Sequence, residues 1–229
     1  MSGMVQLMAK DGVECPAYVA HPAGTARGAV IVMQEIFGVN SHIRGVADGY
    51  AQQGYLAIAP DAFHRVRPHV ELGYGPDDIT QGRALKAAAE ALPAPGVMAD
   101  VAAAIVFGAG STGGKVGIVG YCWGGLLVWR SACSLEGLSA AVAYYGGGMT
   151  SEAEARRQAL CPVMCHFGEQ DHAIPLDGVK AFAQAQPKVE VHIYAAQHGF
   201  NCDQRGSYDA AAAQLAQERT LAFMARHLG

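Results

Sequence analysis

Apolar runs that alternate with helical patterns constrain the fold of this chain more than any other feature of its sequence. Runs that are apolar throughout are typical of strands covered on both faces. Strands that alternate with helices predict a mostly parallel sheet with helices on both faces. The sequence therefore predicts an α/β fold. The expected strands are 28–34, 55–60, 115–120, 139–146, 161–168 and 189–195.

The segments between these runs have helical patterns, apart from one long loop. Ser41 is the expected N-cap of the first helix, and Gly54 is its expected stop. Residues 61–77 hold Pro, His, Arg and Gly without a clear period, which indicates a loop. The expected helices are 41–53, 78–92, 97–107, 124–133, 151–159, 176–184 and 208–227, and a hairpin of 5–9 and 13–19 is expected before the first long strand.

The length and composition suit one sizeable domain. A chain of 229 residues can form one large α/β domain or two small ones, and no linker or composition shift divides it. One domain over 1–229 is therefore expected. With 51% hydrophobic and 16% charged residues, the chain can bury a large core. The net charge is −4 and Lys and Arg do not cluster, so neither nucleic acid nor a membrane is an expected partner.

The amino terminus and the cysteines bear on the compartment. The first residues lack a basic segment followed by an apolar one, and no apolar run approaches the length of a membrane span. The six cysteines form no CxxC pair and no recognisable disulfide framework. A cytoplasmic protein is therefore expected. Cys161, Cys165 and His166 could suggest a metal site, but they lie in an expected buried strand, and two buried structural thiols are the preferred interpretation.

A cysteine between two glycines follows the expected strand 115–120. The segment from Gly120 to Gly124, GYCWG, has the form G-x-S-x-G with sulfur in place of the hydroxyl. That pattern places a nucleophile at a sharp turn between a strand and a helix. The positive end of the following helix favours a thiolate. Cys122 is therefore a candidate nucleophile, although a buried structural cysteine would fit the same position.

An acid and a histidine follow Cys122 in the order that this pattern requires. Asp171 comes just after the strand 161–168, and His198 comes just after the strand 189–195. Both positions are carboxyl ends of strands, where α/β sheets build their sites. His198 can accept the thiol proton while Asp171 orients the imidazole. Glu169 is an alternative acid, whereas core or outward-facing roles are expected for the other nearby histidines, His166, His172 and His192.

The sequence resembles the dienelactone hydrolases (carboxymethylenebutenolidases), small α/β-hydrolases with a cysteine nucleophile. The resemblance covers nearly the whole chain. It implies that Cys122, Asp171 and His198 form a catalytic triad. It is carried by QEIFGVNSHIR (34–44), GYLAIAPD (54–61), GIVGYCWGG (117–125), FGEQDHAIP (167–175) and HGFNCDQRGSYDAAAA (198–213).

The resemblance also implies roles for groups around the triad. The glutamate of the E-I-F-G segment, Glu35, bonds the resting thiol in this family and helps to form the thiolate. A structural role for Glu35, such as a pair with Arg44, is the alternative. The fold's pattern supplies the backbone N–H groups of Trp123 and Ile36 as the oxyanion hole.

The family's diene lactones carry a carboxylate, which arginines near the active site bind. The matches in this sequence are incomplete. One arginine is expected shortly after His198, but Cys202 follows it by four residues and Arg205 by seven. The other arginine is expected in the helix after the 61–77 loop, where Arg83 or Lys86 could serve. Tyr144 is a further candidate for the pocket wall.

These residues predict a hydrolase of lactones or activated esters that acts through a cysteinyl acyl-enzyme. The expected partner is a small ester or lactone, no metal or organic cofactor is needed, and a monomer or weak homodimer is expected. Three alternatives stay open at this point. They are a broad esterase with activity on activated phosphotriesters, a non-catalytic small-molecule binder, and a thiol-redox protein.

Overall fold

The computed structural model describes residues 2–229. Its strands are β1 (Ser2–Met8), β2 (Glu14–Ala20), β3 (Ala29–Met33), β4 (Leu56–Pro60), β5 (Val116–Tyr121), β6 (Leu138–Tyr144), β7 (Val163–Gly168) and β8 (Glu190–Tyr194). Its helices are α1 (Ser41–Gln52), α2 (Pro76–Glu90), α3 (Val97–Thr112), α4 (Trp123–Ser134), α5 (Glu152–Ala155), α6 (Leu176–Ala185) and α7 (Ala210–Leu228).

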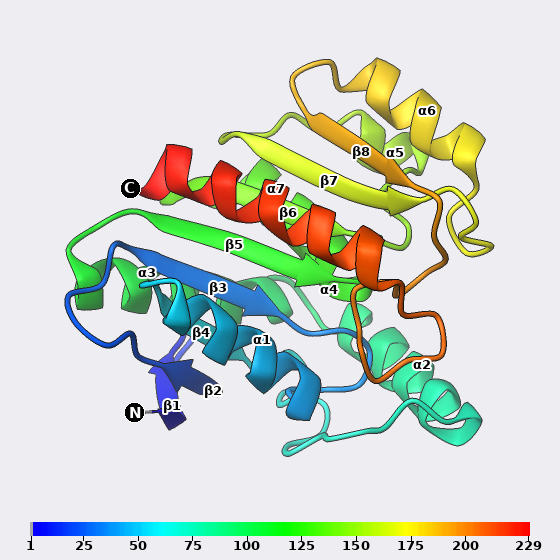
Figure 1. Ribbon diagram of the computed structural model, residues 1–229. Coiled ribbons are helices and arrows are strands. Elements are labelled where there is room, and N and C mark those ends of the chain that lie inside the picture. Colours follow the sequence, from blue (N-terminus) through cyan, green and yellow to red (C-terminus); the bar gives the residue numbers. More distant parts are fainter. Residues whose placement is uncertain (1) are drawn as a thin grey trace.

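The strands form one eight-stranded sheet in the order β1-β2-β4-β3-β5-β6-β7-β8. β1, β2 and β4 pair antiparallel, and every pair from β4 to β8 is parallel. Helices α1 and α7 cover one face, while α3 and α4 cover the other (Figure 1). The α/β-hydrolase fold predicted from the sequence is confirmed.

The continuous apolar runs lie where the sheet is covered on both sides. Every residue of β3, β4 and β5 is buried. The chain continues from β4 on one side of β3 to β5 on its other side. Such a change of direction opens a crevice at the carboxyl ends of the strands, where α/β proteins bind their ligands.

Three helix ends differ from the sequence predictions for identifiable reasons. Asn40, not Ser41, is the N-cap of α1, because its side chain accepts a hydrogen bond from the N–H of Ile43. Helix α3 runs through Gly108, where a Cβ would lie 2.8 Å from that of Ala29, so this glycine allows close packing on the sheet rather than ending the helix. Helix α5 is one turn long, and the Gln186 side chain donates to the carbonyl of Ala155, its last residue, and to that of Arg157 just beyond it.

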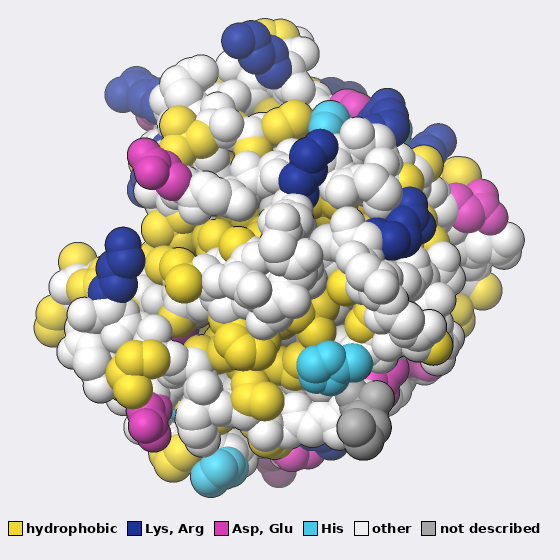
Figure 2. Space-filling view, turned by 90° about the vertical axis from the view of Figure 1, so that its left-hand side faces the viewer, with side chains coloured by type: hydrophobic (Ala, Val, Ile, Leu, Met, Phe, Trp, Pro, Cys, Tyr) yellow, Lys and Arg dark blue, Asp and Glu magenta, His cyan; other side chains and the backbone are white. Residues whose placement is uncertain are grey.

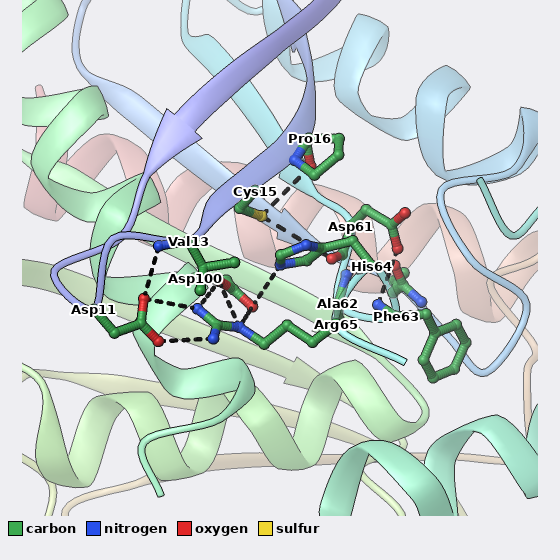
Figure 3. A network of polar contacts seen from close by, with 11 residues as sticks. Asp11, Val13, Cys15, Pro16, Asp61, Ala62, Phe63, His64, Arg65 and Asp100 are labelled. Atoms are coloured by element: carbon green, nitrogen blue, oxygen red, sulfur yellow. Dashed lines mark hydrogen bonds and ion pairs between the residues drawn. The ribbon is translucent and has the colours of Figure 1, made fainter. Parts of the chain in front are cut away.

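A polar network ties the turn after β1 to the loop after β4 (Figure 3). Arg65 binds both carboxylate oxygens of Asp100, through Nε at 2.8 Å and Nη2 at 2.7 Å. Its Nη1 lies 2.7 Å from Asp11 Oδ2, and His64 Nε2 lies 3.0 Å from Asp100 Oδ2. Asp100 is 1% exposed, and its charge is neutralised inside the protein by the Arg65 guanidinium, which Asp11 binds from the other side.

The surface opposite the carboxyl ends of the strands is mixed in character (Figure 2). Hydrophobic side chains occupy much of its centre, and the Lys and Arg side chains on it are scattered rather than gathered. Within residues 2–229, no helix is both long and apolar enough to cross a membrane.

Helix α4 begins unusually close to the end of β3. A Cβ built on Gly124 would lie 2.4 Å from the carbonyl oxygen of Gln34 and 2.6 Å from that of Met33. These contacts are with backbone, which cannot move aside as a flexible side chain would. Glycine is therefore required at position 124 for steric reasons.

We expect Gly124→Ala to lower the free energy of unfolding by about 1–3 kcal/mol, because the added methyl overpacks this contact. Gly45→Ala is the matched control, since a Cβ at this exposed position of α1 meets no atom within 4 Å. That control should gain about 0.5–1 kcal/mol from the helix propensity of alanine. Urea unfolding followed by circular dichroism measures both. Equal stability of the two variants would contradict this account of the packing.

Candidate active site

Four of the residues singled out in the sequence lie at the carboxyl edge of the parallel sheet. Glu35 follows β3, Cys122 follows β5, Asp171 follows β7 and His198 follows β8. At this edge, the change of direction in the strand order opens a crevice. Helix α2 lies beside the same edge (Figure 1).

Cys122 occupies a strained turn between β5 and α4. It is the N-cap of α4 with φ 56° and ψ −117°, a region that residues other than glycine rarely enter. Its N–H donates to the carbonyl of Tyr144 at 3.0 Å, which fixes the turn against β6. The thiol is half-buried and stands at the positive end of α4. A nucleophile elbow has this geometry.

Asp171 and His198 form a direct hydrogen bond. His198 Nδ1 lies 2.7 Å from Asp171 Oδ2. The other oxygen of Asp171 accepts from the N–H groups of Ala173 and Ile174, so the carboxylate is fixed in place. Glu169, the alternative acid, is exposed.

The surroundings of His198 favour its charged form. Burial of the ring opposes a charge there, but the neighbouring Cys122 side chain and the hydrogen bond to Asp171 outweigh it and raise the pKa of His198 to about 10. The ring of Tyr145 packs edge-on against the imidazole, with 5.1 Å between ring centroids. Tyr145 is fully buried and has a φ of 37°.

A buried ion pair lies beside the triad residues. Arg205 Nη1 is 3.0 Å from Glu35 Oε1, and the Glu35 side chain is 1% exposed. The guanidinium carbon of Arg205 stands 5.8 Å from the ring centroid of Phe37 and 5.9 Å from that of Tyr74. A Cβ on Gly199 would lie 2.6 Å from this guanidinium, so the glycine of the H-G-F motif makes room for Arg205.

Glu35 does not pair with Arg44, the partner suggested for a purely structural role. Arg44 Nη1 binds Glu71 Oε1 at 2.9 Å and the carbonyl of Val39 at 2.7 Å. Glu35 Oε2 has no hydrogen-bond partner among the described residues.

The two candidate oxyanion donors lie on either side of the elbow. Trp123 is the first residue of α4, where backbone N–H groups have no partner within the helix. Ile36 follows β3, and α2 packs so closely on it that a Cβ on Gly82 would lie 2.4 Å from its carbonyl oxygen. The indole of Trp123 is buried, stacks on Phe63 and donates to Glu90.

The substrate-binding candidates are not all brought together. Arg205 adjoins the triad residues through Glu35, but Arg83 is an exposed residue of α2 that forms no ion pair with any residue of 2–229. The hydroxyl of Tyr144 is buried 2.7 Å from Thr220 Oγ1, and this side chain lines a cavity between α1 and α7 instead. The aromatic residues around Arg205, Phe37 and Tyr74, were not anticipated, since nothing in their local sequence points to a cation.

The nearby histidine His166 has a structural environment. It is fully buried between the Tyr194 hydroxyl at 2.8 Å and Thr220 Oγ1 at 3.0 Å. Burial lowers its pKa well below the usual value. Among residues 2–229, two clusters have side chains placed to hold a metal. One is Cys15, His64 and Asp100, and the other is Glu35, His42 and Cys202. Neither cluster includes Cys161, Cys165 or His166.

Comparison with known proteins places the chain in a family. Residues 15–228 match the model of the dienelactone hydrolase family. A carboxymethylenebutenolidase from Pseudomonas putida is 33% identical, with 96% of this chain and 95% of the relative covered. A Synechocystis protein provisionally given the same name is 35% identical, over 91% of this chain and 90% of the relative.

Solved structures agree with the fold. A Klebsiella pneumoniae protein provisionally named dienelactone hydrolase superimposes with a TM-score of 0.83 at 33% identity, covering 99% of this chain and 98% of that one. A dienelactone hydrolase-like promiscuous phosphotriesterase from metagenomic libraries has a TM-score of 0.77 at 22% identity, over 100% of this chain and 99% of that one. The chain belongs to the dienelactone hydrolase family and is a hydrolase of carboxylic esters or lactones.

Proposed function

We propose that Cys122 is the nucleophile of a Cys–Asp–His triad that cleaves lactones or activated esters through an acyl-enzyme. The observation that carries the proposal is the 2.7 Å contact between His198 and Asp171, at the sheet edge where Cys122 occupies a strained strand–helix turn. A base that is oriented by an acid beside a nucleophile is the arrangement that acyl transfer requires.

The proposed reaction has two halves. The Cys122 thiolate attacks the carbonyl carbon, and the N–H groups of Trp123 and Ile36 stabilise the oxyanion. Protonated His198 gives its proton to the leaving alkoxide or enolate oxygen, which leaves the acyl group on sulfur. Water then loses a proton to His198 as it attacks the thioester, and the acid departs while the thiolate and the imidazolium re-form. Asp171 keeps the imidazole in one orientation throughout.

Sulfur limits the class of substrate. A thiolate is a good leaving group, so its expulsion from the tetrahedral intermediate competes with expulsion of the alcohol or amine. Stabilised leaving groups, such as those of enol lactones and aryl esters, therefore favour productive reaction, and amides do not. This reasoning supports lactone and ester hydrolysis over peptide hydrolysis. No particular contact of the site favours a phosphotriester or a non-catalytic role.

Arg205 is the proposed recognition group for a substrate carboxylate. It adjoins the triad residues through Glu35, and it also lines a cavity of about 520 Å³ together with Tyr74, Gly75, Gln204, Gly206 and Ser207. A substrate carboxylate bound by Arg205 would weaken its bond to Glu35 and leave Glu35 free to act on the Cys122 thiol.

We expect Cys122→Ala to lower kcat for an aryl ester at least about 10³-fold, because the nucleophile is lost. Rapid quenching of the wild type followed by intact mass spectrometry should show one acyl group per chain, absent from the variant. Cys161→Ala, a half-buried cysteine outside the site, is the matched control and should keep its activity. A variant at position 122 that retained turnover would refute the mechanism.

We expect the pKa of His198 to fall in Cys122→Ala. In the wild type, burial lowers this pKa, but a Cys122 thiolate near the imidazole and the hydrogen bond to Asp171 raise it to about 10. Without Cys122 the burial effect gains relative weight, so the imidazole should lose its proton at lower pH. Nitrogen-15 NMR titration of the imidazole in both proteins measures the change. An unchanged pKa would show that no charge on sulfur stabilises the imidazolium.

We expect Arg205→Met to reduce kcat/KM for a carboxylate-bearing dienelactone about 10–100-fold more than for an uncharged aryl ester, since a hydrogen bond to a charged group contributes about 1.5–3 kcal/mol. The ratio between substrates is the readout, because loss of the bond to Glu35 should affect both. Arg83→Met, at the exposed position on α2, is the control. Equal losses for the two substrates would remove Arg205 from carboxylate recognition, and a selective loss in Arg83→Met would assign that role to Arg83.

A further inference from the structure

Behind the ion pair of Glu35 lies a buried cluster of which the proposed reaction uses only Glu35. It consists of Glu35, His42 and Cys202, and a carboxylate oxygen, a ring nitrogen and the sulfur lie within 4.8 Å of one another. The residues come from the loop after β3, from α1 and from the loop before α7. All three are buried, with exposures of 1%, 6% and 0%.

Two atoms of these side chains have no hydrogen-bond partner. Glu35 Oε2 and His42 Nε2 are both buried, and neither makes a hydrogen bond among the described residues. A buried polar atom without a partner costs about 1–3 kcal/mol, and more for a charged group. Both atoms belong to side chains that are more than nine-tenths buried, so a bound species that satisfied both would be strongly favoured.

The two ring nitrogens of His42 have different surroundings. Its Nδ1 lies 3.4 Å from Asp203 Oδ1, which leaves Nε2 as the nitrogen without a partner. In metalloproteins a carboxylate commonly holds one ring nitrogen of a ligating histidine and so directs the other to the metal. The Asp203 side chain is 70% exposed and would also attract cations from solvent.

A route to the cluster exists. His42 and Asp203 line a cavity of about 500 Å³ between α1 and α7, which Tyr50 and Tyr144 also line. This cavity includes none of the triad residues. An ion could therefore reach His42 without passing the Cys122 thiol.

The second donor cluster, Cys15, His64 and Asp100, differs in one decisive respect (Figure 3). Both oxygens of Asp100 already bind Arg65, so a guanidinium supplies the positive charge that a metal would bring. Glu35 gives only Oε1 to Arg205 and keeps Oε2 available. The two clusters thus provide a matched pair for experiment.

We propose that Glu35, His42 and Cys202 form a site for a divalent ion of the Zn²⁺ class, and that its occupation inhibits the hydrolase. Carboxylate, imidazole and thiolate are the ligands that zinc prefers, and three of them leave a fourth tetrahedral position for water. Binding releases the thiol proton of Cys202 to solvent as the Zn–S bond forms. Tetrahedral ligands stand about 3.3–3.6 Å apart, so the donors need to close by no more than about 1.5 Å. The inhibitory effect rests on the proposed function, because the ion would hold the Glu35 carboxylate away from Cys122.

The test uses Co²⁺ and Zn²⁺ with the Cys122→Ala protein, so that the candidate nucleophile cannot ligate either ion. We expect one equivalent of Co²⁺ to produce a thiolate-to-cobalt charge-transfer band. Competition with a chromophoric chelator then gives the Zn²⁺ affinity. Because these readouts need no turnover, they test the site even if the proposed triad were wrong.

Variants in the Cys122→Ala background locate the ion. Cys202→Ala should abolish the band, and His42→Phe should weaken Zn²⁺ binding at least about 100-fold. Asp203→Asn, a change at an exposed position, should weaken it about 10–100-fold, which keeps the proposal testable if a buried variant misfolds. Cys15→Ala should leave the band and the affinity unchanged. No binding in the parent, a band that survives in Cys202→Ala, or a band lost only in Cys15→Ala would overturn the site.

The inhibition is measured with Cys122 present. Zn²⁺ should lower the aryl esterase rate of the wild type at concentrations that match its affinity for the Cys122→Ala protein, and His42→Phe should resist it. Equal inhibition of wild type and His42→Phe would place the inhibitory ion at Cys122 and His198, and would overturn the regulatory part of the proposal.

Discussion

The backbone contact between the start of α4 and the end of β3 is the constraint on which the rest of the site depends. Gly124 can lie against the carbonyls of Met33 and Gln34 only because it has no side chain. This contact holds Cys122 at a positive φ and brings the residues after β3, Glu35 and Ile36, next to it. Strain of about 1–3 kcal/mol at one residue persists because packing on both sides leaves that residue no alternative.

The second determinant is the buried carboxylate of Glu35. Glu35 is 1% exposed, and one oxygen is neutralised by Arg205, whose own guanidinium lies near two aromatic rings and against Gly199. Removal of one partner from a buried pair typically costs about 3–5 kcal/mol, since the other charge stays without compensation. A cation that binds Glu35, or a substrate carboxylate that binds Arg205, would compete with this ion pair. Either one would therefore alter the carboxyl edge of the sheet by changing the contacts of a few atoms.

Much of this architecture could be predicted from the sequence, because it depends on local patterns. Continuous apolar runs indicated the parallel strands, and the family motifs indicated the chemistry of the sheet edge. The sequence predictions failed where contacts between segments far apart in the chain determine the structure. Gly108 looked like the end of a helix, but it is the place where α3 touches the sheet. The bond between Arg205 and Glu35 joins loops far apart in the chain, and no periodicity or spacing encodes such a contact.

The network of Arg65 has a consequence for how this protein tolerates proteolysis and truncation. The same loop that carries Arg65 continues to Val70, whose carbonyl crowds Gly38, and to Tyr74 beside Arg205. Asp11, in the turn after β1, holds one end of that guanidinium. Cleavage that released the first strand and its turn would therefore loosen a wall of the catalytic crevice, although the cut would lie beside the edge strand of the sheet. Integrity of residues 2–11 is thus a condition for the shape of the cavity beside Arg205, which these residues do not line.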